Sequence, residues 1–161
     1  MAVAALVTWL ITAVGGLVMV AAWASRGGTR AADQRSTTVG AARATAGAAG
    51  LPVSAPTRLR PPLVFAHAGI AVVGLVVWLA YLITDNDGLA WTAFVLLLPV
   101  AVLGLTMFAR WVQAGDHRRD ASVGAARPES AFPLPVVLAH GVFAVTTVIL
   151  VLLTALGTGG S

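Results

Sequence analysis

Two histidines stand inside apolar stretches that are long enough to cross a membrane. His67 and His140 each end one short pattern, Pro-x-Val-x-Ala-His, and each is followed by a small residue. The two copies align at an offset of 73 residues (140 − 67). An ionisable side chain inside a membrane span is costly and generally marks a functional site. Two of them at matching positions indicate one ligand that is held from both sides.

Haem is the ligand that this pair predicts. Neutral imidazoles are axial ligands of haem iron, and helix bundles hold such cofactors between facing helices. Each histidine follows its proline by five residues, which puts both rings about 7–8 Å along their helices at 1.5 Å per residue. We therefore expect His67 and His140 to be the axial ligands of one haem. These residues also leave open a different planar cofactor.

The absence of cysteine narrows the type of haem and the type of metal site. A chain without cysteine has no disulfide, no Cys-ligated iron–sulfur cluster and no covalently attached haem. The expected group is thus a non-covalent haem b. A closed zinc site needs four ligands, and no span supplies an Asp, Glu or Cys to complete one. His117 lies beside Asp116 in a polar connection, where we expect it to face solvent.

Small residues follow both histidines on the same helical faces and could leave space for a macrocycle. Arginines near the same end of the spans could pair with the haem propionates, because guanidinium groups bind carboxylates well. Small residues also serve close helix packing, and threonines can bond their own helix. The pocket candidates are Ala71, Gly74, Ala144 and Thr147, and the propionate candidates are Arg58, Arg60, Arg110 and Arg127.

The chain as a whole reads as an integral membrane protein. Of its 161 residues 58% are hydrophobic and only 10% are charged, a balance that makes the lipid bilayer its solvent. We predict an all-α fold, a four-helix bundle that forms a single membrane domain over 1–161. The four apolar runs of spanning length cover about 2–24, 63–84, 89–112 and 134–156.

The connections predict the orientation. All ten basic residues are arginine, and nine of them lie in the loops 25–61 and 113–133. By the positive-inside rule both loops are cytoplasmic, and both termini and the short turn 85–88 face outward. We expect a multi-pass protein of the plasma membrane, with 25–61 flexible because it lacks a periodic apolar pattern. No basic stripe carries interleaved aromatics, so we expect no nucleic-acid partner.

A second internal repeat involves the other two spans. Met19 and Trp23 recur as Met107 and Trp111 at an offset of 88 (111 − 23), together with several Ala, Val, Gly and Leu positions. The first span thus echoes the third, and the second echoes the fourth. We predict two parallel two-helix repeats, related by an axis along the membrane normal. Equivalent inward-facing residues then lie at one depth and point at each other.

This layout resembles small b-type cytochromes and the haem-bearing anchors of membrane oxidoreductases. The resemblance rests on His67 and His140 with their Pro-x-Val-x-Ala-His surroundings and on the four spans, and it covers the spans only. It implies an electron-transfer role. Members that conduct across the whole membrane commonly stack two haems on four histidines, whereas the spans of this chain offer two, both near the cytoplasmic side.

The expected function is that of a membrane electron-transfer subunit with one haem b, which exchanges electrons with quinone or a partner subunit. The loops are too short for a reductase domain, so we expect a non-catalytic subunit of an oxidoreductase complex, or a homo-oligomer. One alternative is a cofactor-free accessory subunit of a larger membrane complex. Another is a small transporter or channel with a histidine proton relay, which the lack of carboxylates in the spans disfavours.

Overall fold

The computed structural model describes residues 1–26, 59–116 and 132–158, and over these residues the chain forms four α-helices and no strand. The helices are α1 (Ala2–Ser25), α4 (Pro61–Thr84), α5 (Asp87–Asp116) and α6 (Leu134–Ala155). The all-helical prediction is confirmed. The ends of each expected span are within one or two residues of the ends of a helix, except that α5 continues further at its C-terminal end. Most of the predicted loops 25–61 and 113–133 lie outside the described residues.

The two histidine-bearing helices begin in the same way. An extended residue precedes each of them, Arg60 before α4 and Pro133 before α6, and its carbonyl accepts the first backbone hydrogen bonds of the helix. Proline occupies the first turn of both helices. Because the first turn has no intrahelical acceptor for its N–H groups, proline costs nothing there and presets the helical φ. The two helices therefore present their histidines at the same distance from their starts.

A short turn joins α4 to α5 at the opposite end. Asp85 ends α4 in the left-handed region, with φ 52°, and its N–H bonds the carbonyl of Tyr81. Asn86 then caps α5, since its Oδ1 accepts the N–H of Gly88 at 2.9 Å. Asn is among the best residues at this position because its side chain satisfies a free N–H of the first turn. The predicted polar turn 85–88 is thus shorter than expected, because Asp87 and Gly88 already belong to α5.

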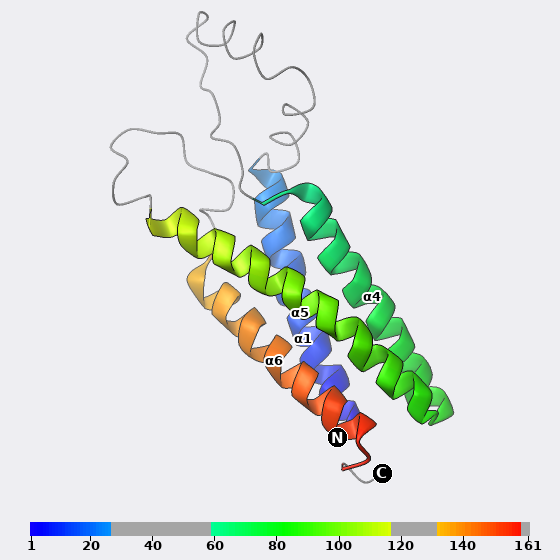
Figure 1. Cartoon of the computed structure of the whole chain (residues 1–161). Helices are drawn as coiled ribbons and strands as arrows, with labels where there is room; N and C mark the ends of the chain where they lie inside the picture. Colours follow the sequence, from blue (N-terminus) through cyan, green and yellow to red (C-terminus); the bar gives the residue numbers. More distant parts are fainter. Residues whose placement is uncertain (27–58, 117–131, 159–161) are drawn as a thin grey trace, which may run out of the picture.

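The helices pack as a bundle in which neighbouring helices run in opposite directions (Figure 1). The most extensive contacts are those of α4 with α5 and of α1 with α6, and the contact of α1 with α4 is the smallest of the four. Helices α4 and α6 therefore occupy opposite corners of the bundle. Both termini and the α4–α5 turn lie at one end, which we call the turn end, and the long connections leave from the other, the loop end (Figure 1).

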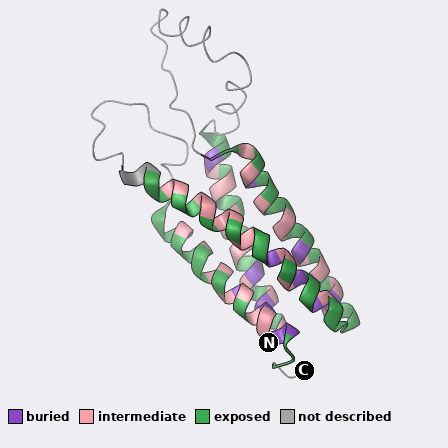
Figure 2. Cartoon of the chain, viewed as in Figure 1, coloured by how far each residue is buried: buried purple, intermediate pink, exposed green. Residues whose placement is uncertain are grey.

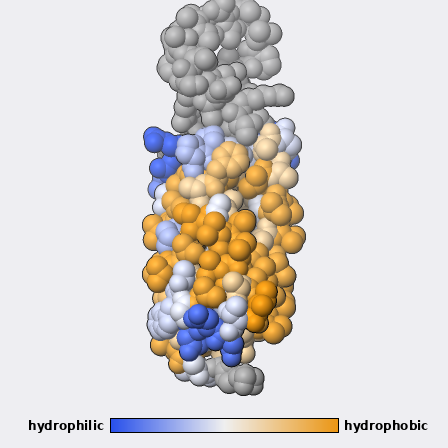
Figure 3. Space-filling model, turned by 90° about the vertical axis from the view of Figure 1, so that its right-hand side faces the viewer, coloured by the Kyte–Doolittle hydropathy of each residue, from blue (hydrophilic) through white to orange (hydrophobic). Residues whose placement is uncertain are grey.

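The outside of the bundle is apolar. All four helices are long and apolar enough to cross a membrane. Large aliphatic side chains cover the outer faces, among them Val14, Leu17, Val72 and Val102. Figure 3 shows hydrophobic surface over most of one side, with hydrophilic residues gathered toward the ends. Surfaces of this kind are stable in lipid rather than in water, so the chain is a multi-pass membrane protein.

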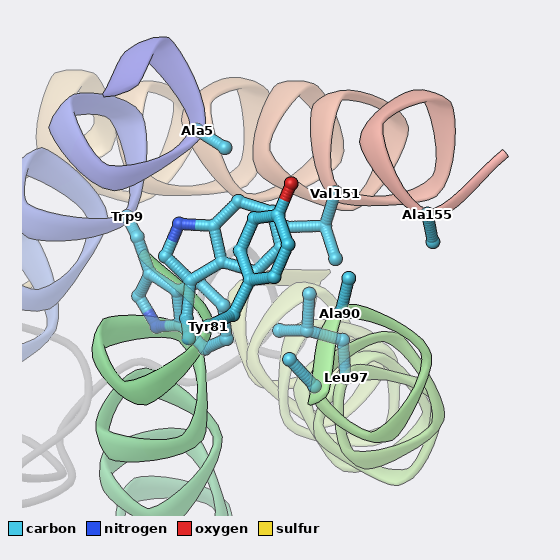
Figure 4. Close-up of a cluster of buried hydrophobic side chains, with 9 residues drawn as sticks. Ala5, Trp9, Tyr81, Ala90, Leu97, Val151 and Ala155 are labelled. Carbon is cyan, nitrogen blue, oxygen red and sulfur yellow. The ribbon is translucent and has the colours of Figure 1, made fainter. Parts of the chain in front are cut away.

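Full burial is concentrated in the turn-end half (Figure 2). The turn-end core consists of Ala5, Trp9, Trp78, Tyr81, Ala90, Ala93, Leu97, Val151 and Ala155 (Figure 4). A smaller cluster of Trp23, Leu59 and Val64 lies near the loop end. Between Val100 and Gln113 of α5, and between Phe132 and Thr146 around the start of α6, no residue is buried. The histidines belong to this loosely packed half.

Candidate functional site

The two predicted ligands meet inside the bundle. His67 projects from α4 and His140 from α6, and their ring centroids are 6.3 Å apart with an angle of 52° between the ring planes. Both side chains are half-buried. Residues 73 positions apart in the sequence therefore face each other from opposite corners of the bundle.

Each ring makes one hydrogen bond to the backbone of a neighbouring helix. Nδ1 of His67 lies 3.0 Å from the carbonyl oxygen of Val100 in α5, and Nδ1 of His140 lies 2.9 Å from that of Thr12 in α1. Because a carbonyl oxygen only accepts, Nδ1 carries the proton and donates in both cases. The neutral ring then has its lone pair on Nε2, the atom that a metal binds in this tautomer.

A glycine beside each ring makes these hydrogen bonds sterically accessible. A Cβ on Gly16 would come within 3.3 Å of Cε1 of His140, and one on Gly104 within 3.2 Å of Cε1 of His67. Gly16 follows Thr12 by four residues, as Gly104 follows Val100. On a helix the side chain at i+4 lies over the turn that exposes the carbonyl at i. The two glycines thus leave the carbonyls open to the imidazoles.

The predicted pocket residues are placed differently from one another. Ala71 and Ala144, four residues beyond His67 and His140, are half-buried. Gly74 is buried against another side chain, since a Cβ there would lie 3.1 Å from Cζ2 of Trp9. Thr147 is also buried, and its hydroxyl is within hydrogen-bond distance of Thr8 Oγ1 at 2.9 Å and of the Phe143 carbonyl at 2.8 Å. Gly74 and Thr147 thus lie at contacts between helices. Ala71 and Ala144 are the candidates nearest to the histidines along the chain.

The arginine candidates for the propionates divide into two groups. Arg60 is exposed at the start of α4, and Arg110 is half-buried near the loop end of α5, where it interacts with another group. Arg58 and Arg127 lie outside the described residues, as does His117. Arg60 and Arg110 are therefore at the same end of the bundle as the histidines.

Several residues of the site were not anticipated. Thr12 and Val100 take part through backbone carbonyls, which have no sequence signature. Gly16 and Gly104 do have one, because they are equivalent in the 88-residue repeat. The indole Nε1 of Trp111 is buried and has no acceptor among the described residues, and the same holds for that of Trp78 in the turn-end core.

The chemistry open to this arrangement is that of two neutral imidazoles in an apolar setting. Among the described residues, no group of three or more His, Cys, Asp or Glu side chains is arranged to hold a metal ion. A ligand bound here would thus have two protein nitrogens and little else that is polar. No protein-family model, no curated protein and no solved structure matches this chain.

Proposed function

We propose that the chain binds one b-type haem through Nε2 of His67 and Nε2 of His140. In this proposal it is a non-catalytic electron-transfer subunit, which exchanges electrons with quinone or with a partner subunit of an oxidoreductase complex. When bound, haem iron takes up and releases one electron. The chain itself provides the two ligands, their orientation and an apolar surrounding.

The observation that carries the proposal is the matched pair of Nδ1–H···O=C hydrogen bonds. Histidines that bind metals almost always donate their other N–H to a carbonyl or carboxylate, which fixes the tautomer and the ring orientation. Here both rings do so, at 3.0 Å and 2.9 Å. One such bond would be enough for a histidine whose role is to join two helices. Here both rings make the same bond, so both Nε2 lone pairs remain available, and the two rings are neighbours.

The spacing of the rings supports a single iron between them. Metal–imidazole bonds are about 2.0–2.1 Å long. Two such bonds in line, together with the distance from each coordinating nitrogen to the centroid of its ring, give a length similar to the 6.3 Å between the two centroids.

The loop end of the site supplies donors for an anionic edge. Trp111 lies two turns beyond Gly104 toward the loop end, and its Nε1–H is buried and has no acceptor among the described residues. A haem propionate would provide that acceptor, and a charged acceptor makes the stronger bond. Arg60 and Arg110 lie near the same end, so we assign them to the same carboxylates in this proposal.

The proposal includes an origin by duplication of a helix pair. His67 with Val100 and Gly104 corresponds to His140 with Thr12 and Gly16 under the 73- and 88-residue offsets. A twofold axis that exchanges α1 with α5 and α4 with α6 also exchanges the two most extensive helix contacts. These correspondences support two parallel repeats, with the histidines facing each other across the axis.

The proposed location is the plasma membrane, with the arginine-rich loops on the cytoplasmic side. The histidines are in the loop-end half, so the haem would lie close to that side. A single haem so placed suits exchange with a membrane-dissolved carrier or a cytoplasmic-side partner better than conduction across the whole bilayer.

Optical spectra of the purified protein test the proposal. We expect a sharp reduced α-band after dithionite in the wild type, and its loss in His67→Ala and in His140→Ala. Gly69→Ala and Gly141→Ala are matched controls, because a Cβ at either position meets nothing within 4 Å, and both should keep the band. Colourless wild-type protein from haem-replete cells would refute haem binding and favour the cofactor-free accessory subunit, in which the histidines only join helices.

A further inference from the structure

A groove on the membrane-facing side of the bundle leads to one of the two histidines. It lies between α1 and α6 and has a volume of about 350 Å³. Its walls include Val14, Gly15 and Val18 from α1 and Ala139, His140 and Phe143 from α6. Val14 and Val18 are exposed on the outer surface, so the groove opens toward lipid.

Gly15 is the reason that the groove reaches the ring. A Cβ there would lie 3.6 Å from Cβ and Nδ1 of His140, an ordinary van der Waals distance. Glycine thus leaves space that a side chain could fill without displacing the histidine. The position equivalent to Gly15 in the 88-residue repeat is Leu103, so the corresponding place beside His67 carries a bulky side chain. At this position the two halves of the repeat therefore differ in the size of the side chain next to the histidine.

We propose that this groove binds the ring of an isoprenoid quinone, with the isoprenoid tail in the surrounding lipid. The choice of a redox-active ring rests on the proposed function, because His140 is both a groove wall and a haem ligand. The lining contains no charged residue, and its one polar side chain is His140. That lining suits a neutral occupant and excludes one with a phosphate or carboxylate in the groove.

The aromatic side chains favour a ring over a lipid acyl chain. His140 and Phe143 lie one turn apart on α6, and both contribute to the groove. Small-molecule sites are largely apolar with aromatic walls, and offset stacking adds to the burial of a ring. Nδ1 of His140 already donates to the Thr12 carbonyl, so stacking and apolar contact hold the quinone. The quinone would then contact His140 directly, so that this one side chain separates it from the haem.

Photolabelling in nanodiscs tests this site without relying on electron transfer. The full chain is reconstituted in phosphatidylcholine nanodiscs with a photoreactive azidoquinone, and crosslinked residues are mapped by mass spectrometry. We expect crosslinks within 11–18 and 135–143 that unlabelled quinone displaces and a fatty-acid ester of equal length does not. Gly15→Leu, which copies Leu103, should lower labelling about tenfold, the size of one lost ring contact. Gly69→Ala, at a position outside the groove lining where an added Cβ meets nothing within 4 Å, should label like the wild type.

A second variant guards against a folding defect in Gly15→Leu. Val18→Trp fills the groove from its exposed rim and should lower labelling to a similar extent. Labelling that both variants leave unchanged, crosslinks confined to other segments, or equal displacement by the fatty-acid ester would each overturn the proposal, the last by identifying an acyl-chain groove.

Optical spectra of the same nanodiscs separate this proposal from the one on which it rests. Groove labelling in colourless protein would uphold the quinone site and refute the haem. A reduced α-band without groove labelling would uphold the haem and refute the quinone site.

Discussion

At the scale of single residues, two glycines decide how the histidines are held. Gly16 and Gly104 carry no side chain at the points where the rings reach the carbonyls of Thr12 and Val100. In a different setting, a histidine side chain could donate to a carbonyl of its own helix, or it could make no hydrogen bond to a helix. With glycine at these points, the ring of each histidine instead lies against a neighbouring helix, and the donor of the bond is fixed as Nδ1.

If the chain binds haem as proposed, alanine at either glycine should therefore weaken that binding. A Cβ would lie 3.3 Å from His140 Cε1 in Gly16→Ala and 3.2 Å from His67 Cε1 in Gly104→Ala, closer than ordinary contacts. The ring must give way by a few tenths of an ångström, which lengthens or breaks the bond from its Nδ1–H to the carbonyl. Loss of a partner of this kind typically lowers metal affinity about 10- to 100-fold. Haem titration of the apo-protein measures it.

The neighbouring position provides the control for this prediction. Gly15→Ala adds its Cβ 3.6 Å from His140, which needs no movement, so its haem affinity should equal that of the wild type. Equal affinities for Gly15→Ala, Gly16→Ala and Gly104→Ala would show that the hydrogen bonds do not position the ligands.

At the scale of helices, the pairs α1–α6 and α4–α5 use different contacts at equivalent positions. Thr8 and Thr147 share a hydrogen bond between α1 and α6. The corresponding positions in α5 and α4 are Leu96 and Gly74, where a Cβ on the glycine would lie 3.7 Å from Leu96 Cβ. The same place is polar in one pair and a close apolar contact in the other.

Removal of the Thr147 hydroxyl should cost little stability. Thr147→Val loses the bond to Thr8, and hydrogen bonds between membrane helices contribute about 0.6 kcal/mol on average and at most about 1.7. We expect a decrease of that size in the free energy of unfolding, measured in mixed micelles with denaturing detergent. Thr146→Val is the control, because the Thr146 hydroxyl bonds only the Val142 carbonyl of its own helix. A similar loss in both variants would contradict a role between helices.

A large side chain at Gly74 should be more harmful. Gly74→Leu places atoms within about 3 Å of the Trp9 ring, which is itself buried in the turn-end core. Overpacking of this kind costs about 1–3 kcal/mol. Gly69→Leu is the control, because a Cβ at Gly69 meets nothing within 4 Å. Its free energy of unfolding in the same micelles should equal that of the wild type. If Gly74→Leu were equally stable, Trp9 would have to be free to move.

The helices were predictable, and so was the pair of histidines, but the details that connect them were not. Continuous apolar runs identify spans directly, whereas their ends depend on capping. Asn86 extends α5 back to Asp87 through a side-chain bond, and the last turns of α5 continue past the apolar part. The partners of the rings are backbone carbonyls, so only the repeated glycines could have indicated them. Gly74 looked like free space, but Trp9 packs on it.

At the scale of the whole molecule, the bundle has two distinct ends. Both termini and the α4–α5 turn share one end, and the long connections share the other (Figure 1). From the positive-inside rule we predict that the arginine-rich end faces the cytoplasm.

Single cysteines should report this orientation. The chain contains no cysteine, so each introduced thiol is the only one. In intact cells an impermeant maleimide should label Asn86→Cys and Thr158→Cys, and it should label Arg26→Cys and Arg60→Cys only after permeabilisation. The reverse pattern would place the histidines near the outer surface of the membrane.

The concentration of buried side chains in the turn-end half has a consequence for how the protein is assembled. Segments without buried contacts open at low free energy, while a packed core opens only on global unfolding. Amides of α5 beyond Val100 and of α6 before Thr147 should exchange with deuterium first, and those around Trp78 and Val151 last. In the proposed function, the bundle would thus close at the turn end while the histidine end still opens, and the flat cofactor would enter there after the helices have been inserted.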